Sequence, residues 1–334
     1  MAPPGGHPAQ GRRPCPAVAG GGEGDRSCRR CHRQACGPGL RSQMPEQSIH
    51  FDSGGLRLAG VVRTPDVLGS GERRPAFLVL HGFGSHKGAG NVLGPCAVLE
   101  SLGYVTLRFD MRGCGESEGV RGNLICLEQV EDTRAALTFL AGHPGVDPAR
   151  IAVVGSSFGA AVAVYTAGVD ERVAAVISSG GWGHGEIKFR GQHPGDEAWA
   201  RFTAMLAEGR RHRERTGESL MVPRMDIVPV RHGLTREILP GSLQSFTAET
   251  AQSMFDFRAE DVVDRIAPRP LLLLHSSFDT VTPTEQSLRM FARAKSPVDL
   301  HLFGDTDHFM LAEGNQRVWN VVRDWLGRYF PVTS

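Results

Sequence analysis

The sequence predicts an α/β protein built on a doubly wound, mostly parallel β-sheet flanked by helices. Short aliphatic runs alternate along the chain with longer helical patterns, which is the order of strands and crossover helices in such a sheet. Several runs are apolar at consecutive positions, as in strands that helices cover on both faces. Because crossover connections are right-handed, this alternation builds one sheet with helices on each side.

Six aliphatic runs are the expected strands, and five helical patterns lie between or after them. The strands are predicted over 76–82, 105–110, 151–157, 174–180, 271–277 and 298–304. The helices are predicted over 91–102, 127–142, 159–168, 283–295 and 315–330. Before them, two alternating stretches flank Ser53, Gly54 and Gly55, which predicts a β-hairpin that adds antiparallel strands to the sheet edge.

The composition changes at about Met44. Residues 1–43 hold four of the 7 cysteines and are rich in Gly, Pro and Arg, with almost no large apolar side chains. Such a segment buries too little surface to offset its chain entropy, so we expect a disordered leader. The α/β domain is expected over 44–332.

This leader contains a C-x-x-C-H pattern, which is typical of haem attachment and, with a further cysteine, of zinc sites. Cys28, Cys31 and His32 match the attachment pattern of c-type haem, and Cys36 would complete a zinc set. Haem attachment requires export and a packed pocket, and a pattern of five residues arises easily by chance in a segment rich in Arg and Cys. We therefore expect no cofactor and no metal.

One stretch interrupts the alternation of strands and helices. From about 183 to 262 there is no good strand, and prolines occur at 194, 223, 229 and 240 among polar helical segments. An insertion of this length between two strands is longer than an ordinary connection and usually covers a site. We interpret it as a helical cap.

The charge balance bears on partners and location. The chain has 37 basic and 36 acidic residues and a formal net charge of +1, so no strong field indicates a nucleic acid or a membrane as partner. No run of about 18 apolar residues occurs, and the N-terminus lacks the pattern of a secretory signal. We expect a cytoplasmic protein with a small-molecule substrate, and the oligomeric state stays open.

The stretch VVGSSFGA, residues 153–160, is the first candidate for chemistry. Ser157 lies between Gly155 and Gly159, which matches G-x-S-x-G at the end of a predicted strand and the start of a helix. The sharp turn holds the central serine in a strained conformation, and the glycines avoid clashes with neighbouring backbone. We therefore predict that Ser157 is a nucleophile above a helix N-terminus, whose dipole favours negative charge.

A serine nucleophile needs a base and an orienting acid, in the chain order Ser, Asp, His for this type of turn. Asp279 follows the strand predicted over 271–277, and His308 follows the last strand. Both positions lie at carboxyl ends of strands, where ligands of open α/β sheets bind. We predict that Asp279 is the acid and His308 the base.

Other histidines and aspartates are assigned structural roles. His275 and His301 occupy positions within strands, and Asp305 and Asp307 are too close to His308 in sequence to face its Nδ1. The oxyanion of acyl transfer also needs donors. We predict that one donor is the backbone N–H of Phe83, in the stretch HGFGSHKG. The other is the backbone N–H of Phe158, directly after the nucleophile.

Residues 46–332 resemble an α/β-hydrolase. The motifs HGFGSHK, DMRGCGES, GSSFG, FDTVTP and DHF occur in this order and are similar to the branch that contains serine aminopeptidase-like hydrolases and feruloyl-type esterases. The resemblance implies a Ser157–Asp279–His308 triad, an oxyanion hole at Phe83 and Phe158, and a structural turn over 110–117. HGFG lacks the Gly-Gly-Gly loop of some lipases, which argues against bulky tertiary esters.

The function expected from these residues is hydrolysis of a carboxylic ester, or a related acyl bond, of a small molecule through an acyl-enzyme. Alternatives are acyl transfer, acyl elimination, C–C cleavage or thioester hydrolysis on the same site. Four arginines of the cap could bind the phosphates or carboxylates of a carrier protein or a coenzyme A thioester: Arg210, Arg211, Arg213 and Arg215. A solvated helix face is the simpler explanation for this cluster.

Overall fold

The computed structural model describes residues 46–65, 69, 71–230, 241–312 and 314–333. The chain separates into two units, Met1–Ser42 and Gln43–Ser334, and every described residue belongs to the second. The leader expected over 1–43, with its C-x-x-C-H pattern, lies outside the described residues.

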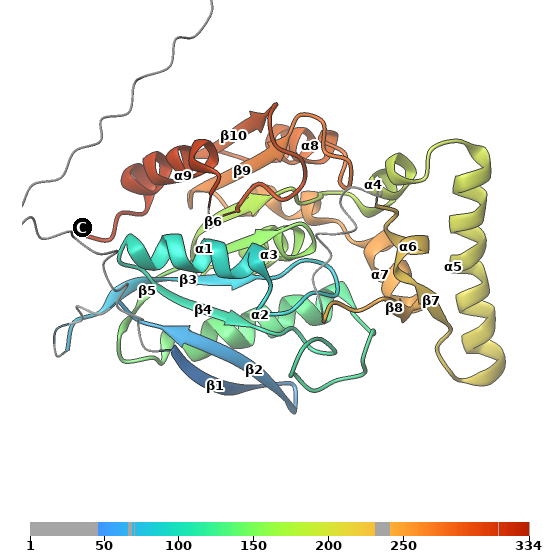
Figure 1. The fold of residues 1–334 in the computed structure, drawn as a ribbon, viewed down its shortest axis with the longest axis horizontal. Helices are drawn as coiled ribbons and strands as arrows, with labels where there is room; N and C mark the ends of the chain where they lie inside the picture. The colour runs from blue at the N-terminus through green and yellow to red at the C-terminus, as the bar shows by residue number, and fades with distance from the viewer. Residues whose placement is uncertain (1–45, 66–68, 70, 231–240, 313, 334) are drawn as a thin grey trace, which may run out of the picture. The chain divides into compact units, whose positions relative to one another are not determined.

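An eight-stranded sheet forms the centre of this unit (Figure 1). Its strands, in order across the sheet, are β1 (Glu46–Ser53), β2 (Leu56–Arg63), β4 (Val105–Phe109), β3 (Arg74–Leu80), β5 (Val146–Ser156), β6 (Val173–Ser179), β9 (Leu271–Ser276) and β10 (Val298–Phe303). β2 pairs antiparallel with β1 and β4, and the other neighbours are parallel. The predicted doubly wound, mostly parallel sheet and its antiparallel hairpin are confirmed.

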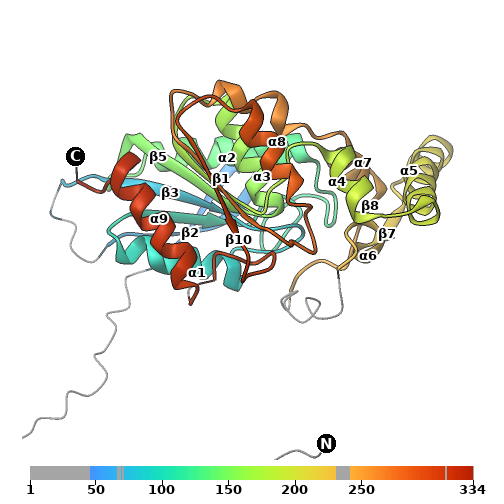
Figure 2. The same ribbon diagram turned by 90° about the horizontal axis from the view of Figure 1, so that it is seen from above.

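Helices cover both faces of the sheet, as Figure 2 shows. One face carries α1 (Gly90–Ser101) and α9 (Gln316–Tyr329), and the other carries α2 (Cys126–Ala141), α3 (Phe158–Val169) and α8 (Glu285–Arg293). Alternate residues of β3 therefore enter different cores: Phe77 and Val79 pack with α1 and α9, whereas Leu78 and Leu80 pack with α2 and α3. This two-sided burial explains why the strand reads as a continuous apolar run.

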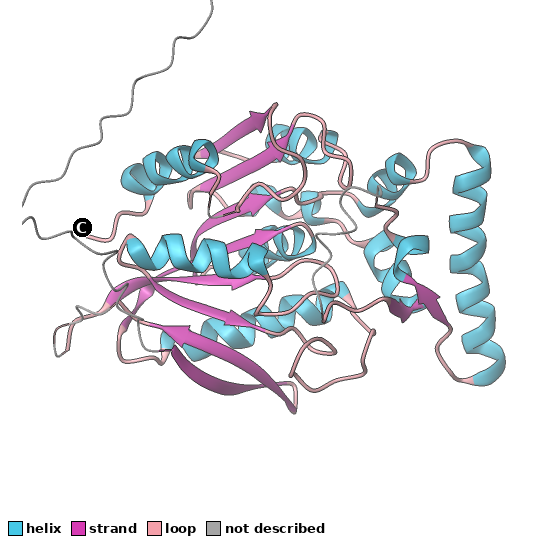
Figure 3. Cartoon of the chain, viewed as in Figure 1, coloured by secondary structure: helices cyan, strands magenta, loops and turns pink. Residues whose placement is uncertain are grey.

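Between β6 and β9 the chain leaves the sheet for residues 180–270, which we call the insertion. Its described residues form α4 (Gly185–Gln192), α5 (Asp196–Thr216), β7 (Met221–Pro223), α6 (Arg224–Ile227), β8 (Ser245–Thr247), α7 (Ala248–Asp256) and two 3₁₀ turns (Ala259–Asp261, Val263–Arg265). The expectation of no strand here was wrong, because β7 and β8 pair antiparallel with Val222 opposite Phe246 (Figure 3). Strands of three residues are too short to show an alternating pattern.

None of the helices in the described ranges combines the length and the apolar character that a membrane span requires.

The turn after β4 is fastened to the loop after β3 by a buried carboxylate. Asp110 is 1% exposed, and its Oδ1 accepts the Lys87 N–H at 2.6 Å. Its Oδ2 accepts the Lys87 ammonium at 2.6 Å and the Glu116 N–H at 2.9 Å. Gly115 closes over this carboxylate with φ 50°, and a Cβ there would lie 2.2 Å from Asp110 Cγ. Only glycine lets the turn close in this way.

A lysine is buried where α4 packs against the rest of the fold. Lys188 is 2% exposed, and its Nζ donates to Gln192 Oε1 at 2.8 Å. The ammonium lies 3.8 Å from the ring centroid of Phe189 and 4.7 Å from that of Trp182. It forms no ion pair with a carboxylate of the described residues, and burial lowers the pKa of Lys188 to about 7. The charged form is therefore costly in the native state.

Replacing Gly115 with Ala should reduce the free energy of unfolding by about 2–4 kcal/mol, because the new Cβ meets the Asp110 carboxylate in a left-handed backbone. Urea unfolding measures the loss. The control is Gly142→Ala at the end of α2, where φ is −85° and the nearest atom to a Cβ is 3.6 Å away. A loss of similar size in both variants would contradict this account of the turn.

Replacing Lys188 with Met should raise the free energy of unfolding by about 1–3 kcal/mol at pH 6, where both states of the wild type hold the proton. Between the native pKa of about 7 and the ordinary value of 10.5, the unfolded chain holds more protons, so wild-type stability rises with pH. The advantage of the variant should therefore shrink from pH 6 to pH 9.

Urea unfolding at both pH values measures this change. Lys295→Met is the control, because Lys295 is exposed and pairs with Asp264 at 3.1 Å. If Lys188→Met is no more stable than the wild type at pH 6, or if the stability difference does not change with pH, the charged Lys188 does not destabilise the native state.

Candidate active site

Ser157 lies at the sharp turn between β5 and α3. Its φ is 57°, and among the described residues it is the only one other than glycine with a positive φ. Its N–H donates to Ser179 O at 2.8 Å, and its carbonyl accepts the N–H groups of Ala160 and Ala161 at 3.1 and 3.2 Å. A serine in such a conformation costs about 1–3 kcal/mol and persists only when its surroundings fix it. The strain identifies this turn as a candidate site.

The two glycines of the motif let the backbones approach. A Cβ on Gly155 would lie 2.2 Å from Gly159 O, and a Cβ on Gly159 would lie 2.6 Å from His81 O. A side chain on Gly155 would therefore push the start of α3 away from β5, and one on Gly159 would push it away from the end of β3. This contact is the physical reason for G-x-S-x-G at this position.

Asp279 and His308 form a buried hydrogen-bonded pair. His308 Nδ1 lies 2.8 Å from Asp279 Oδ2 and 3.0 Å from Oδ1. Oδ1 also accepts the N–H groups of Val281 and Thr282 at 2.8 and 2.7 Å. Burial alone would raise the pKa of Asp279, but the neighbouring rings of His308 and His275 and their hydrogen bonds hold it well below its usual range. The carboxylate is therefore ionised.

Gly180 connects this pair to the serine turn. Ser157 is bonded to Ser179, and a Cβ on Gly180 would lie 3.2 Å from His308 Nδ1 and 3.5 Å from Asp279 Oδ2. The three predicted residues thus surround the end of β6. Within the described part of the chain no hydrogen bond joins Ser157 to His308, and such contacts often tighten only when substrate is bound.

His275 supports the acid from behind, a contact that sequence reasoning missed. Its ring is fully buried, with Nδ1 2.6 Å from Ser287 Oγ and Nε2 3.0 Å from Thr282 O. Nε2 also lies 3.4 Å from Asp279 Oδ2. The assignment to packing within the strand was therefore incomplete. A histidine four residues before an aspartate in an apolar strand was the only available signal.

The other aspartates near His308 have turn and surface contacts. Asp307 accepts the N–H and the hydroxyl of Thr280 at 2.9 and 2.7 Å, which ties the loop after β10 to the loop after β9. Asp305 pairs with Arg317 at the surface, 2.8 Å apart. His301 lies on the exposed side of β10. None of these three side chains contacts the His308 ring nitrogens.

The loop after β3 is arranged by His81. Its Nε2 accepts the Met111 N–H at 3.1 Å, so its Nδ1 carries the proton and donates to Gly82 O at 2.8 Å. Burial lowers the pKa of His81, which is consistent with this neutral form. The Gly82 carbonyl also accepts the Ser85 N–H at 3.1 Å. In a trans peptide the Phe83 N–H points opposite to that carbonyl.

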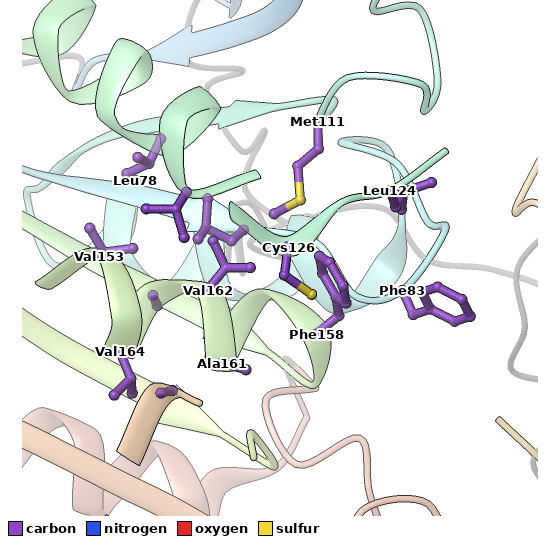
Figure 4. Packing of buried hydrophobic residues seen from close by; sticks show 14 of the residues in the cluster. Leu78, Phe83, Met111, Leu124, Cys126, Val153, Phe158, Ala161, Val162 and Val164 are labelled. Atoms are coloured by element: carbon purple, nitrogen blue, oxygen red, sulfur yellow. The ribbon is translucent and has the colours of Figure 1, made fainter. Parts of the chain in front are cut away.

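The two predicted oxyanion donors form no backbone hydrogen bond with the part of the chain that the structure describes. Neither the Phe83 N–H nor the Phe158 N–H has an acceptor in the described ranges. A Cβ on Gly82 would lie 3.7 Å from Ser157 Cβ, so the loop passes next to the serine. Figure 4 shows Phe158 in a cluster with Met111 and Cys126, and its ring centroid is 6.0 Å from that of Phe83. Phe83 and Phe158 therefore both lie close to the turn of Ser157.

Two side chains of the insertion pack against these phenylalanines, and no local sequence pattern predicts either contact. Phe246 stacks on Phe83 at 4.1 Å, and Trp182 lies 5.7 Å from Phe158, between ring centroids. Both are fully or almost fully buried. The rings of Phe246 and Trp182 thus cover the side chains of Phe83 and Phe158.

A hollow of about 350 Å³ adjoins the acid loop. Its lining includes Asp279, Thr280, Val281, Gln192 and Pro229. A larger hollow of about 800 Å³ lies along α2 and the β1–β2 turn, and it contains none of the three predicted residues. Within the described ranges, no three His, Cys, Asp or Glu side chains are grouped to hold a metal ion.

Comparison with known proteins gives a family and several relatives. The family model described as serine aminopeptidase S33 matches residues 71–315. A thiohydrolase, aneE, from Aspergillus aculeatus is 28% identical over 281 residues, which are 78% of this chain and 85% of that protein. GrgF from a Penicillium species, named a polyketide transferase, is 25% identical over 302 residues, 86% of this chain and 98% of that protein.

Solved structures share the fold. The crystal structure of GrgF, described as an α/β-hydrolase, has a TM-score of 0.71 and covers 86% of this chain and 99% of its own. Est1E from Butyrivibrio proteoclasticus with ferulic acid bound has a TM-score of 0.60 at 19% identity, covering 84% of this chain and 98% of its own. Since the family match spans most of the chain and the sheet has the same architecture, this protein belongs to the serine aminopeptidase S33 family of α/β-hydrolases.

Proposed function

We propose that this protein is a serine hydrolase that cleaves a carboxylic ester, or a related acyl bond, of a small molecule. Ser157 is the nucleophile, His308 the general base and Asp279 the acid that orients the histidine. The observation that carries the proposal is the buried pair of His308 and Asp279, 2.8 Å apart, around the same strand end as a serine with strained backbone. This combination is the one that activates a hydroxyl for attack.

The reaction starts with the serine proton. Because the Nδ1–H of His308 donates to Asp279, the Nε2 of the ring is the basic nitrogen. Nε2 takes the proton of the Ser157 hydroxyl as the oxygen attacks the carbonyl carbon of the substrate. The ionised Asp279 stabilises the imidazolium, which then gives its proton to the leaving group as the acyl-enzyme forms.

Two backbone donors accommodate the negative charge of this step. The carbonyl oxygen becomes an oxyanion and accepts hydrogen bonds from the Phe83 and Phe158 N–H groups. The N-terminal end of α3 adds a favourable dipole. Water then attacks the acyl-enzyme with His308 again as base, which releases the acid and restores Ser157.

Thioester cleavage or acyl transfer is the second candidate for the same site. The names of the relatives favour it, since one is a thiohydrolase and another a polyketide transferase. A substrate bound to a carrier protein or to coenzyme A would meet cationic side chains on α5. There, Arg211 pairs with Glu208, and Arg210 donates to Gln252, so the cluster is only partly neutralised by the protein.

Ser157→Ala should lower turnover of p-nitrophenyl, phenolic and thioester substrates by roughly a millionfold, because no other group replaces the nucleophile. Labelling by a fluorophosphonate probe should also disappear. Ser156→Ala, one residue earlier in β5, is the matched control and should keep both activities. Labelling that persists in Ser157→Ala would refute the assignment.

Asp279→Asn should lower turnover by roughly 10⁴, because the amide favours the wrong tautomer of His308. Asp305→Asn should leave turnover unchanged, since Asp305 only pairs with Arg317 at the surface. Asp307→Asn should have a smaller effect than Asp279→Asn, because an amide oxygen still accepts from Thr280. Steady-state kinetics on one ester measure all three, and equal losses would mean that another residue orients the base.

A further inference from the structure

We propose that Arg224, in the insertion, is a positioning residue for the oxyanion hole. It fixes the Phe83–Gly84 segment and holds a positive charge beside it that no carboxylate of the described residues neutralises. The inference rests on the proposed function, because it takes the Phe83 N–H as a donor to the oxyanion.

The side chain of Arg224 bridges the loop after β3 and the strand region of the insertion. Its Nη2 donates to Phe83 O at 2.8 Å, and its Nη1 donates to Leu243 O at 3.1 Å. The Leu243 N–H in turn donates to Gly84 O at 2.8 Å. Two neighbouring carbonyls of the loop are thus held by one segment of the insertion. The loop has little freedom to turn its peptide groups.

Aromatic packing fixes the guanidinium in the same place. Its Cζ lies 5.1 Å from the ring centroid of Phe83 and 5.9 Å from that of Phe246. Gly84 has φ 55°, and a Cβ there would lie 2.4 Å from Phe246 and 3.1 Å from Arg224 Nη1. The arginine therefore fills a space with no room for a side chain on the loop, and cation–π contact favours its position.

The charge of Arg224 is balanced only by backbone dipoles within the described residues. Among the described residues, both hydrogen-bond acceptors of its guanidinium are backbone carbonyl groups, and no carboxylate forms an ion pair with it. Burial lowers the pKa of Arg224 to about 10, so the group is still a cation at neutral pH. Arg224 is partly buried, and a cation partly removed from water without a counter-ion is costly unless a negative charge develops nearby.

That negative charge is the oxyanion. Phe83 O and Phe83 N belong to one residue, so the guanidinium lies within roughly 7 Å of the proposed donor. Because the protein partly excludes water around this side chain, a cation at this range stabilises an anion better than it would in bulk solvent. The ground-state carbonyl is neutral and gains little. Arg224 should therefore act on kcat and hardly on KM.

Three variants of the full chain test this role: Arg224→Met, Arg224→Lys and Arg224→Ala. On a p-nitrophenyl ester, Arg224→Met should lose about 10- to 100-fold in kcat, with KM within threefold of the wild type. Its affinity for an aryl boronic acid, which mimics the tetrahedral intermediate, should fall by a similar factor. Arg224→Lys should be intermediate, and added ethylguanidinium should restore part of the activity of Arg224→Ala but not of Arg224→Met.

The control is Arg201→Met, because Arg201 is an exposed arginine of the insertion that pairs with Glu197 on the same helix. Each rate is divided by the amount of protein that the fluorophosphonate probe labels at its end-point, so that unfolded protein does not lower the apparent kcat. A kcat of Arg224→Met equal to the wild type, a change in KM alone, or a loss that disappears after this correction would overturn the proposal. Activity that survives Ser157→Ala would instead refute the proposed function itself.

Discussion

The close approach of α3 to the end of β3 is the contact on which the site depends. A Cβ on Gly159 would lie 2.7 Å from Leu80 O and 2.6 Å from His81 O, so the two backbones are in contact with no room for a side chain between them. This contact holds Ser157 in its strained turn and brings the loop of Phe83 beside it. The fold tolerates the strained backbone of Ser157 because a large sheet with a hydrophobic core on each face surrounds it.

Asp279 and His308, the proposed acid and base, depend on a second arrangement, the pairing of β9 with β10. These neighbours are parallel, so the loops that carry Asp279 and His308 leave the sheet at the same edge. Asp307 ties one loop to the other through Thr280, and His275 supports the carboxylate from below. The low pKa of Asp279 thus results from groups that different strands deliver to one place.

Much of this arrangement could be predicted because it has a local signature. Aliphatic runs in the sequence predict the buried strands, and the glycines on either side of Ser157 predict the sharp turn. The start of β5 at Val146 was missed, since Pro148 and charged neighbours break the apolar pattern there. Arg224 and Phe246 were missed for another reason. Their roles come from contacts with a loop far away in sequence, and no periodicity or spacing records such contacts.

The insertion starts after one strand and returns to its hydrogen-bonded neighbour, because β6 and β9 are adjacent in the sheet. The sheet is therefore complete whatever the intervening residues fold into, provided that they return to the same edge. The insertion can therefore change in length and sequence without disturbing the pairing of β6 with β9. Arg224 is the exception under our proposal, because its guanidinium bonds to Phe83 in the loop after β3.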